Sequence, residues 1–294
     1  MTQSTGGHVL SEETAKGRIV AVIGGGRMGS GIVHAFLLAG NHVRLVEVSR
    51  EFREAALARV NKLVEASASR AALTEGVQVV LARLSIHGEL ADVAGSDLVI
   101  EAVPEILDLK LSVLAAAGEV LGPESLLATN TSSISINRLG GALPAPNRFL
   151  GLHFFNPVPA SLLVEIVRGG ATSEETVAAA REWVQCIAKT PIVVSDSPGF
   201  ASSRLGLALG LEAIRMVEAG VATPEDIDQA IVLGYKHPVG PLRLTDIVGL
   251  DVRLGIAQYL ESELGERFTP PDLLVTMVAE GRLGQKSGQG FYQW

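Results

Sequence analysis

The chain has 294 residues, with 24 Lys and Arg against 32 Asp and Glu, and its net charge is -8 at pH 7. This length leaves room for about two domains. An acidic chain without a basic cluster cannot neutralise the phosphates of a nucleic acid or of an anionic membrane, so we expect neither as a partner. The single cysteine, Cys186, excludes an intramolecular disulfide and a cysteine metal centre, so we predict a cytoplasmic protein without a metal.

The first part of the chain alternates short β-branched runs with longer helical patterns. Residues 1–17 are polar and lack the layout of a secretory signal, so we predict a flexible tail there. From Arg18 onward the alternation predicts an α/β fold, with a parallel sheet and crossover helices, over residues 18–194. The expected strands cover 19–23, 43–46, 97–101 and 126–129, and the expected helices cover 29–39, 51–67 and 107–120.

After Val194 the pattern becomes helical, which predicts a second, all-helical domain over residues 195–294. Ser197-Pro198 and Thr223-Pro224 each have the composition of a helix start, a cap followed by proline. The helix expected over 204–217 is apolar on almost every face, and Gly206 and Gly210 would let another helix come close. We therefore predict a homodimer formed by this domain.

A glycine-rich turn follows the first expected strand. Gly24, Gly26 and Gly29 form a GxGxxG pattern between a strand and a helix, where backbone N–H groups can approach a pyrophosphate; Arg27 and Met28 lie in the same turn. Glu47 ends the second strand, where its carboxylate would bind a ribose 2′-hydroxyl and repel a 2′-phosphate. The alternative is a tight turn beside a surface glutamate. The combination predicts NAD as cofactor, although Arg50 could moderate the discrimination against NADP.

Two further expected strands bring a histidine and a glutamate together. Residues 149–155 and 162–168 flank a proline-rich turn, and pairing them about Pro159 puts His153 opposite Glu165. A histidine held by a carboxylate has a fixed tautomer and a stabilised imidazolium, as a base that takes a hydroxyl proton during hydride transfer requires. Taken alone, such a pair is more often structural, with the histidine satisfied by its own strand.

The sequence resembles the 3-hydroxyacyl-CoA dehydrogenases, especially the short bacterial 3-hydroxybutyryl-CoA type, over nearly all of residues 18–294. The motifs that carry the resemblance are the glycine turn, Asn130-Thr131-Ser132-Ser133, His153-Phe154-Phe155-Asn156-Pro157, Asp196-Ser197-Pro198-Gly199-Phe200, and Lys286-Ser287-Gly288-Gln289-Gly290-Phe291-Tyr292. The resemblance implies a Rossmann-like doubly wound N-terminal domain, a helical C-terminal domain that binds substrate and dimerises, and a short-chain acyl-CoA substrate.

The resemblance also implies a role for individual residues. His153 matches the catalytic base and Glu165 its partner, and Ser132 matches the serine that bonds the reacting oxygen. Asn156 matches a residue near the nicotinamide. Cofactor contacts are implied for Glu105, Lys110, Ser132, Asn156 and Lys286. Each has an ordinary structural alternative: a helix cap for Ser132, a solvated ion pair for Glu105 and Lys110, a turn former for Asn156, and a tail charge for Lys286.

Two departures from the family pattern bear on the substrate. Ser203 stands where the family usually has an asparagine near the substrate, so one hydroxyl replaces an amide. The helix after the second strand offers few of the lysines typical of acyl-CoA binders, only Arg50, Arg53, Arg59, Lys62 and Arg70. A dehydrogenase of a free hydroxy acid, of the gulonate or carnitine type, is therefore the alternative enzyme. A non-catalytic dinucleotide-binding protein is the alternative of another class.

Overall fold

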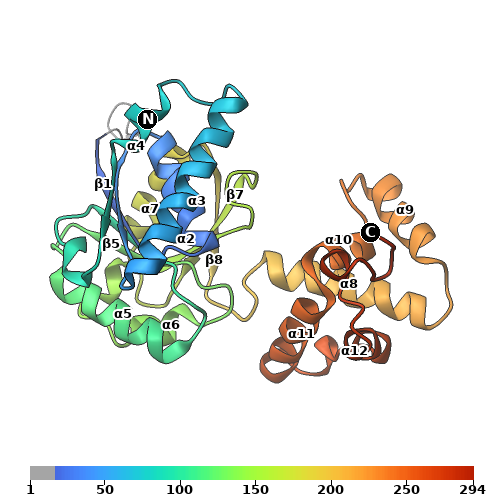
Figure 1. Cartoon of the computed structure of the whole chain (residues 1–294). Helices are drawn as coiled ribbons and strands as arrows, with labels where there is room; N and C mark the ends of the chain where they lie inside the picture. Colours follow the sequence, from blue (N-terminus) through green and yellow to red (C-terminus); the bar gives the residue numbers. More distant parts are fainter. Residues whose placement is uncertain (1–16) are drawn as a thin grey trace, which may run out of the picture. The chain divides into compact units, whose positions relative to one another are not determined.

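The computed structural model describes residues 17–294, so the tail expected over residues 1–17 lies, apart from Gly17, outside the described residues. The chain divides into two compact units, one ending at Asp196 and the other spanning Ser197–Trp294. Figure 1 shows the sheet and its helices in the first unit and the helices of the second. Within residues 17–294, no helix combines the length and the apolar character needed to span a membrane.

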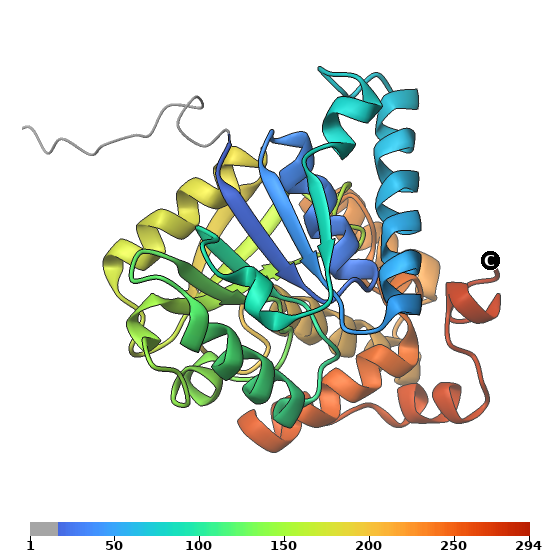
Figure 2. The same ribbon diagram turned by 60° about the vertical axis from the view of Figure 1, so that its left-hand side comes forward.

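The first unit is built on one eight-stranded sheet with the order β3-β2-β1-β4-β5-β6-β7-β8. The strands are β1 (Ile19–Ile23), β2 (His42–Val46), β3 (Leu84–His87), β4 (Leu98–Glu101), β5 (Leu126–Thr129), β6 (Phe149–Phe154), β7 (Leu163–Arg168) and β8 (Thr190–Ser195). Neighbouring strands run parallel except β6 and β7, which are antiparallel. Figure 2 shows β1, β2 and β3 next to one another from a second direction.

Helices cover both faces of the sheet. They are α2 (Arg27–Leu38), α3 (Arg50–Ser69), α4 (Val77–Leu81), α5 (Leu107–Val120), α6 (Ile136–Gly140) and α7 (Glu174–Cys186), with single 3-10 turns η1 (Leu90–Val93) and η2 (Pro146–Arg148). Helices α2, α3 and α7 share one apolar core with alternate strand residues such as Val20 and Val22. The intervening residues, such as Ala21, are also buried, because the sheet is covered on its other face too. The expected α/β fold is thus confirmed.

The differences from the sequence expectations lie in short elements. Helix α2 begins at Arg27, two residues before its expected start, because the glycine turn is shorter than the motif suggests. Strand β3 was not predicted, because it is an edge strand of only four residues and two of them, Ser85 and His87, are polar. Helices α4, α6 and α7 and strand β8 were not predicted from the sequence either. None of these elements forms the glycine turn or the His153 strand.

The parallel direction of the strands brings the sequence motifs to one edge of the sheet. Strands β1, β2, β4, β5 and β6 all run the same way, so their carboxyl ends meet at that edge. The order reverses between β1 and β4, since the chain continues from β1 to β2 on one side and resumes with β4 on the other. In open α/β sheets the crevice at such a reversal is where ligands bind.

The second unit consists of helices α8 (Ser202–Glu218), α9 (Pro224–Tyr235), α10 (Pro241–Val248), α11 (Leu250–Leu264) and α12 (Asp272–Ala279), with 3-10 turns η3 (Glu266–Phe268) and η4 (Gln285–Ser287). Its core includes Leu207 and Leu211 of α8. Thr223 caps α9 as expected, since its side chain accepts a hydrogen bond from the N–H of Asp226.

The expected start of α8 was wrong. Ser197-Pro198 does not start the helix, because Gly199 and Phe200 have positive φ angles of 73° and 46° and form a turn that the α-helix cannot continue. The helix begins at Ser202. Gly210 faces Thr245 within the same unit, where an added Cβ would lie 3.2 Å from the threonine hydroxyl. This glycine therefore allows α8 to approach α10 rather than a second copy of the chain.

Candidate active site

The glycine turn between β1 and α2 uses its three motif glycines in different ways. Gly24 has a φ of +102°, and a Cβ there would lie 2.8 Å from the carbonyl oxygen of Ala102. A Cβ on Gly29 would lie 1.8 Å from the Gly24 carbonyl oxygen, so this glycine closes the turn onto the helix. A Cβ on Gly26 would meet no atom within 4 Å. The structure itself does not require glycine at position 26, which leaves close approach of a ligand as the reason for it.

A cavity of about 570 Å³ opens beside this turn. Gly24, Gly26, Arg27, Met28 and Glu47 line one part of it, and the apolar side chains lining the remainder include Val48, Phe52, Leu109 and Val113. The first turn of the twelve-residue helix α2 lies at this wall, so its N–H groups and positive dipole end favour an anion there. The residues present therefore fit a dinucleotide, with phosphates at the glycines and an apolar wall for a base.

Glu47 is one of the residues that line this cavity. Its Oε2 accepts a hydrogen bond from the N–H of Gly25 at 3.0 Å, and its Oε1 accepts one from the N–H of Val48 at 3.1 Å. The carboxylate is thus fixed against the glycine turn, in position to accept ribose hydroxyls and to repel a phosphate. Arg50 instead pairs with Glu54 in an exposed ion pair.

Arg59 also lines the cavity, although its place in the sequence does not predict a cofactor contact. It lines the same cavity, and its Nη2 donates a hydrogen bond to the Gly25 carbonyl oxygen at 3.0 Å. The hydroxyl of Ser30 donates to that oxygen as well. In the sequence, Arg59 is one of several charges on a charged helix, so only the packing of α3 against the turn distinguishes it.

His153 and Glu165 form the expected pair. The two residues are directly opposite each other on β6 and β7, and Nδ1 of His153 lies 2.7 Å from Oε2 of Glu165. Glu165 is fully buried and His153 is 6% exposed. The ring of Phe155 lies against the imidazole, with 4.5 Å between the ring centroids. A buried carboxylate at this distance holds the imidazole ring in one orientation.

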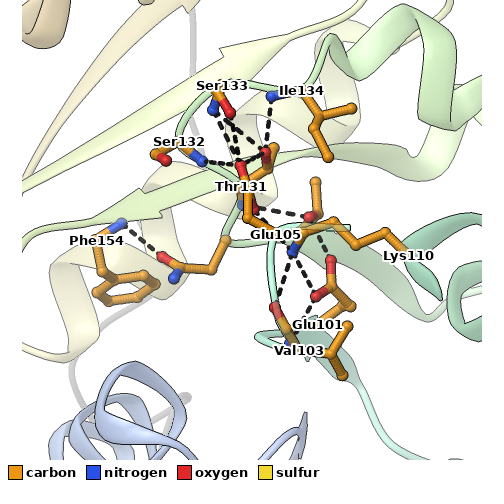
Figure 3. A network of polar contacts seen from close by, with 11 residues as sticks. Glu101, Val103, Glu105, Lys110, Thr131, Ser132, Ser133, Ile134 and Phe154 are labelled. Atoms are coloured by element: carbon orange, nitrogen blue, oxygen red, sulfur yellow. Dashed lines mark hydrogen bonds and ion pairs between the residues drawn. The ribbon is translucent and has the colours of Figure 1, made fainter. Parts of the chain in front are cut away.

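The turn that carries Ser132 is held by Glu105. Its Oε1 accepts hydrogen bonds from the Thr131 hydroxyl and from the N–H groups of Ser132 and Ser133 (Figure 3). Burial raises the pKa of the Glu105 carboxyl, but the hydrogen bond from Thr131 and the ammonium of Lys110 outweigh it and lower the pKa below its usual value. The Ser132 side chain is exposed at the carboxyl end of β5.

Lys110 lies beneath this surface rather than on it. The side chain is 1% exposed, and its Nζ donates to Oε1 of Glu101 at 2.7 Å and to the Val103 carbonyl oxygen at 3.3 Å. A second carboxylate, that of Glu105, lies 3.3 Å away. The structure thus joins the buried Lys110 to Glu105, whose side chain is partly exposed, and a contact between Lys110 and the cofactor stays a prediction.

Three other predicted site residues lie outside these clusters. Asn156 is exposed in the turn after β6. Ser203 is the second residue of α8, and Lys286 lies in η4, where its Nζ is 2.6 Å from Oδ2 of Asp251. Both belong to the helical unit, and their expected contacts with substrate and cofactor stay predictions.

The comparisons with known proteins agree with the resemblance. Residues 19–197 match the family model of the 3-hydroxyacyl-CoA dehydrogenase NAD-binding domain, and residues 199–294 match that of the C-terminal domain. The chain is 43% identical over 279 residues to a 3-hydroxybutyryl-CoA dehydrogenase of Mycobacterium tuberculosis, covering 94% of this chain and 98% of the relative.

A relative from Bradyrhizobium diazoefficiens, also a 3-hydroxybutyryl-CoA dehydrogenase, is 41% identical over 277 residues, which cover 94% of each chain. The crystal structure of (S)-3-hydroxybutyryl-CoA dehydrogenase from Ralstonia eutropha superposes with a TM-score of 0.89 at 38% identity. That match covers 94% of this chain and 99% of the other. Similarity to these proteins therefore extends through both units.

Proposed function

Because this chain belongs to the 3-hydroxyacyl-CoA dehydrogenase family, we propose that it interconverts a short-chain (S)-3-hydroxyacyl-CoA and the corresponding 3-ketoacyl-CoA with NAD. The observation that carries the proposal is the buried pair of His153 and Glu165 at the sheet edge that also carries the glycine turn and Ser132. The turn formed by Thr131, Ser132 and Ser133 is called the serine turn below. A dinucleotide-binding protein without catalysis has no need of a buried histidine and carboxylate beside this turn.

The pair of His153 and Glu165 acts on the substrate hydroxyl. The Glu165 carboxylate accepts a hydrogen bond from Nδ1 of His153. The neutral imidazole therefore carries its proton on Nδ1 and has its lone pair on Nε2. In the oxidation direction, Nε2 takes the proton of the 3-hydroxyl as the hydride leaves C3. The carboxylate of Glu165 stabilises the imidazolium that forms. In the reverse direction the imidazolium returns the proton to the carbonyl oxygen.

The remaining groups hold the reactants. Bound NAD supplies the acceptor for the hydride. The glycine turn and the start of α2 hold the phosphates of the cofactor, and Glu47 holds its ribose. The Ser132 hydroxyl donates a hydrogen bond to the reacting oxygen, where negative charge develops during reduction of the ketone. Asn156 orients the nicotinamide, as the family resemblance implies.

The substrate class comes from the relatives and has a direct test. The two curated relatives and the solved structure are dehydrogenases of 3-hydroxybutyryl-CoA. We expect NADH oxidation with acetoacetyl-CoA to have a kcat/KM at least ~100-fold above that with free acetoacetate, because the reaction uses the binding energy of the CoA part. His153→Ala, assayed under the same conditions, controls for contaminating activity.

The assay also decides between the alternatives. Comparable turnover of free acetoacetate would favour a dehydrogenase of free hydroxy acids, the class suggested by the few basic residues of α3. Absence of turnover with either substrate, despite NADH binding, would favour a non-catalytic dinucleotide-binding protein and contradict the proposal.

We also propose a homodimer that acts in the cytoplasm. The helical unit leaves large apolar side chains in contact with solvent, among them Leu205 (71% exposed), Leu233 (73%) and Tyr235 (76%). Contact with a second copy would remove this surface from water. The cytoplasmic location is supported by the single cysteine and by the dependence on a pyridine nucleotide.

A further inference from the structure

Glu101, the last residue of β4, is a buried carboxylate that the proposed reaction does not use. Its side chain is fully buried, and an ionised carboxylate without partners is costly to bury. Both oxygens have partners: Oε1 accepts from the Val103 N–H and from the Lys110 ammonium at 2.7 Å each, and Oε2 accepts from the Thr129 hydroxyl. Glu101 thus joins the ends of the two central strands β4 and β5.

Lys110 connects Glu101 to a second carboxylate. Its ammonium has three donors and three nearby acceptors: Oε1 of Glu101, the Val103 carbonyl oxygen, and Oε2 of Glu105 at 3.3 Å. Figure 3 shows the lysine between the two glutamates. The lysine is 0.6 Å nearer to Glu101 than to Glu105, the difference between 3.3 Å and 2.7 Å. Glu101 therefore takes the larger share of this buried positive charge.

Glu105 uses its other oxygen for the serine turn. Oε1 accepts from the N–H groups of Ser132 and Ser133 and from two hydroxyls, whereas Oε2 faces Lys110. The two demands compete for one side chain, because a closer approach to the ammonium draws the carboxylate away from the turn. The turn also depends on Thr129, whose hydroxyl oxygen accepts from the N–H of Thr131 while its proton goes to Glu101.

We propose that Glu101 is a positioning residue that sets the place of Ser132 by neutralising Lys110, so that Glu105 stays bonded to the serine turn. This inference rests on the proposed function only for the role of Ser132 in turnover. Val103 donates its N–H to Glu101 and accepts a hydrogen bond from Lys110 at its carbonyl oxygen. The same residue lines the dinucleotide cavity. The network therefore joins the wall of the cofactor site to the serine turn.

The test removes the charge of Glu101 and measures how well the amides of the serine turn are protected from hydrogen exchange. Hydrogen exchange of the Ser132 and Ser133 amides should be at least about 10-fold faster in Glu101→Gln, because Glu105 moves toward the unneutralised lysine. Asp97→Asn is the matched control, because it also replaces a carboxylate by an amide. Asp97 directly precedes the first residue of β4, is exposed, and accepts a hydrogen bond from the Ile19 N–H. This control should leave exchange of the turn unchanged. Equal exchange in wild type and Glu101→Gln overturns the proposal.

A double variant separates positioning from general damage. In Glu101→Gln/Lys110→Met the ammonium is absent as well, so Glu105 has no reason to leave the turn, and protection of the two amides should return to within about 3-fold of wild type. A merely structural role would make the double variant worse than the single one. If Glu101→Gln does not fold, the double variant, which buries no unpaired charge, carries the test alone, and fast exchange in it overturns the proposal.

Kinetics then link the turn to turnover. At saturating NADH, Glu101→Gln should lower kcat with acetoacetyl-CoA about 10-fold and change the Kd for NADH by less than about 3-fold. Unchanged kcat in an active enzyme whose turn exchanges faster overturns the link to Ser132. If the wild type has no turnover, the proposed function fails, while the exchange measurements still decide whether Glu101 positions the turn.

Discussion

Nδ1 of His153 lies 2.7 Å from Oε2 of Glu165, on two antiparallel strands whose register puts the residues directly opposite each other. The contact depends on both side chains facing the same side of the sheet, because a slip of one residue would move either one to the other face. The N–H of Phe154 donates to the Asn130 side chain, which ties β6 to the end of β5 near the serine turn. The pair is therefore held by the sheet rather than by a loop.

Replacing either member of the pair should remove turnover without removing cofactor binding. His153→Ala should lower kcat at least ~100-fold because the acid-base group is lost, and Glu165→Gln should slow the same step because the imidazolium loses its charged partner. NADH binding, measured by fluorescence titration, should be nearly unchanged in both. Glu119→Gln, an exposed position in α5, serves as control. Near-normal kcat in His153→Ala would disprove the assignment of the base.

The glycine turn offers a pair of identical substitutions with opposite expected effects. Gly26→Ala adds a methyl group that meets no protein atom within 4 Å, so the fold should be kept while NADH affinity falls at least ~10-fold, because the methyl occupies the approach of the phosphates. Gly29→Ala puts a Cβ 1.8 Å from the Gly24 carbonyl oxygen and should destabilise the fold by roughly 2 kcal/mol or more.

Denaturant unfolding and calorimetric titration measure the two glycine effects separately. The ligand interpretation of Gly26 predicts loss of affinity without loss of stability. Full NADH affinity in Gly26→Ala would mean that the phosphates do not pass this residue.

Glu47 should decide between NADH and NADPH. We expect the wild type to bind NADH at least ~10-fold more tightly, because a 2′-phosphate would face the fixed carboxylate. Glu47→Ala should weaken NADH more than NADPH and so narrow the difference. Isothermal titration of both cofactors to both proteins checks this, with the exposed Glu51→Ala as a neighbouring control. Equal wild-type affinities for the two cofactors would show that Glu47 does not face the ribose.

His34 should make the fold sensitive to acid. Burial, assisted by the Lys189 ammonium, lowers the pKa of His34 from 6.5 to about 4. As pH falls from 6.5 toward 4, the unfolded chain binds a proton that the folded chain excludes, so the free energy of unfolding decreases over that range. The full effect on the free energy of unfolding is on the order of 3 kcal/mol, because the pKa of His34 falls from 6.5 to about 4.

Denaturant unfolding between pH 7 and about pH 4.5 tests the acid sensitivity. His34→Gln should lose less stability than the wild type over this interval, because no proton uptake distinguishes its unfolded state at that position. The exposed His42→Gln should behave like the wild type. The same slope in His34→Gln and wild type would mean that His34 contributes no acid sensitivity.

The apolar surface of the helical unit should hold two copies of the chain together. We expect light scattering to give the mass of a dimer at micromolar concentration, and Leu205→Glu or Leu233→Glu to shift the mass toward the monomer, because each puts a charge on an exposed apolar position. Val79→Glu charges an exposed apolar residue of the first unit and should leave the mass unchanged. A stable wild-type monomer would contradict the proposal.

The sequence by itself determined the features that depend on local spacing. The alternation of apolar runs predicts the α/β fold, the glycine motif predicts the turn before α2, and the symmetry about Pro159 predicts the pairing of His153 with Glu165, because antiparallel register follows from counting residues across a turn. Cap patterns were less reliable. Thr223 caps a helix, whereas Ser197 does not, because Gly199 and Phe200 have positive φ angles that interrupt the helix.

Only the tertiary structure decided the contacts between distant segments. The sequence offered a cofactor contact or a solvated ion pair for Lys110, whereas its burial beside Glu101 follows from the packing of α5 against β4. Arg59 reaches the Gly25 carbonyl because α3 packs beside the glycine turn. Charged residues carry no hydrophobic period that reveals such partners, so their roles emerge only when the fold has fixed which charges are buried together.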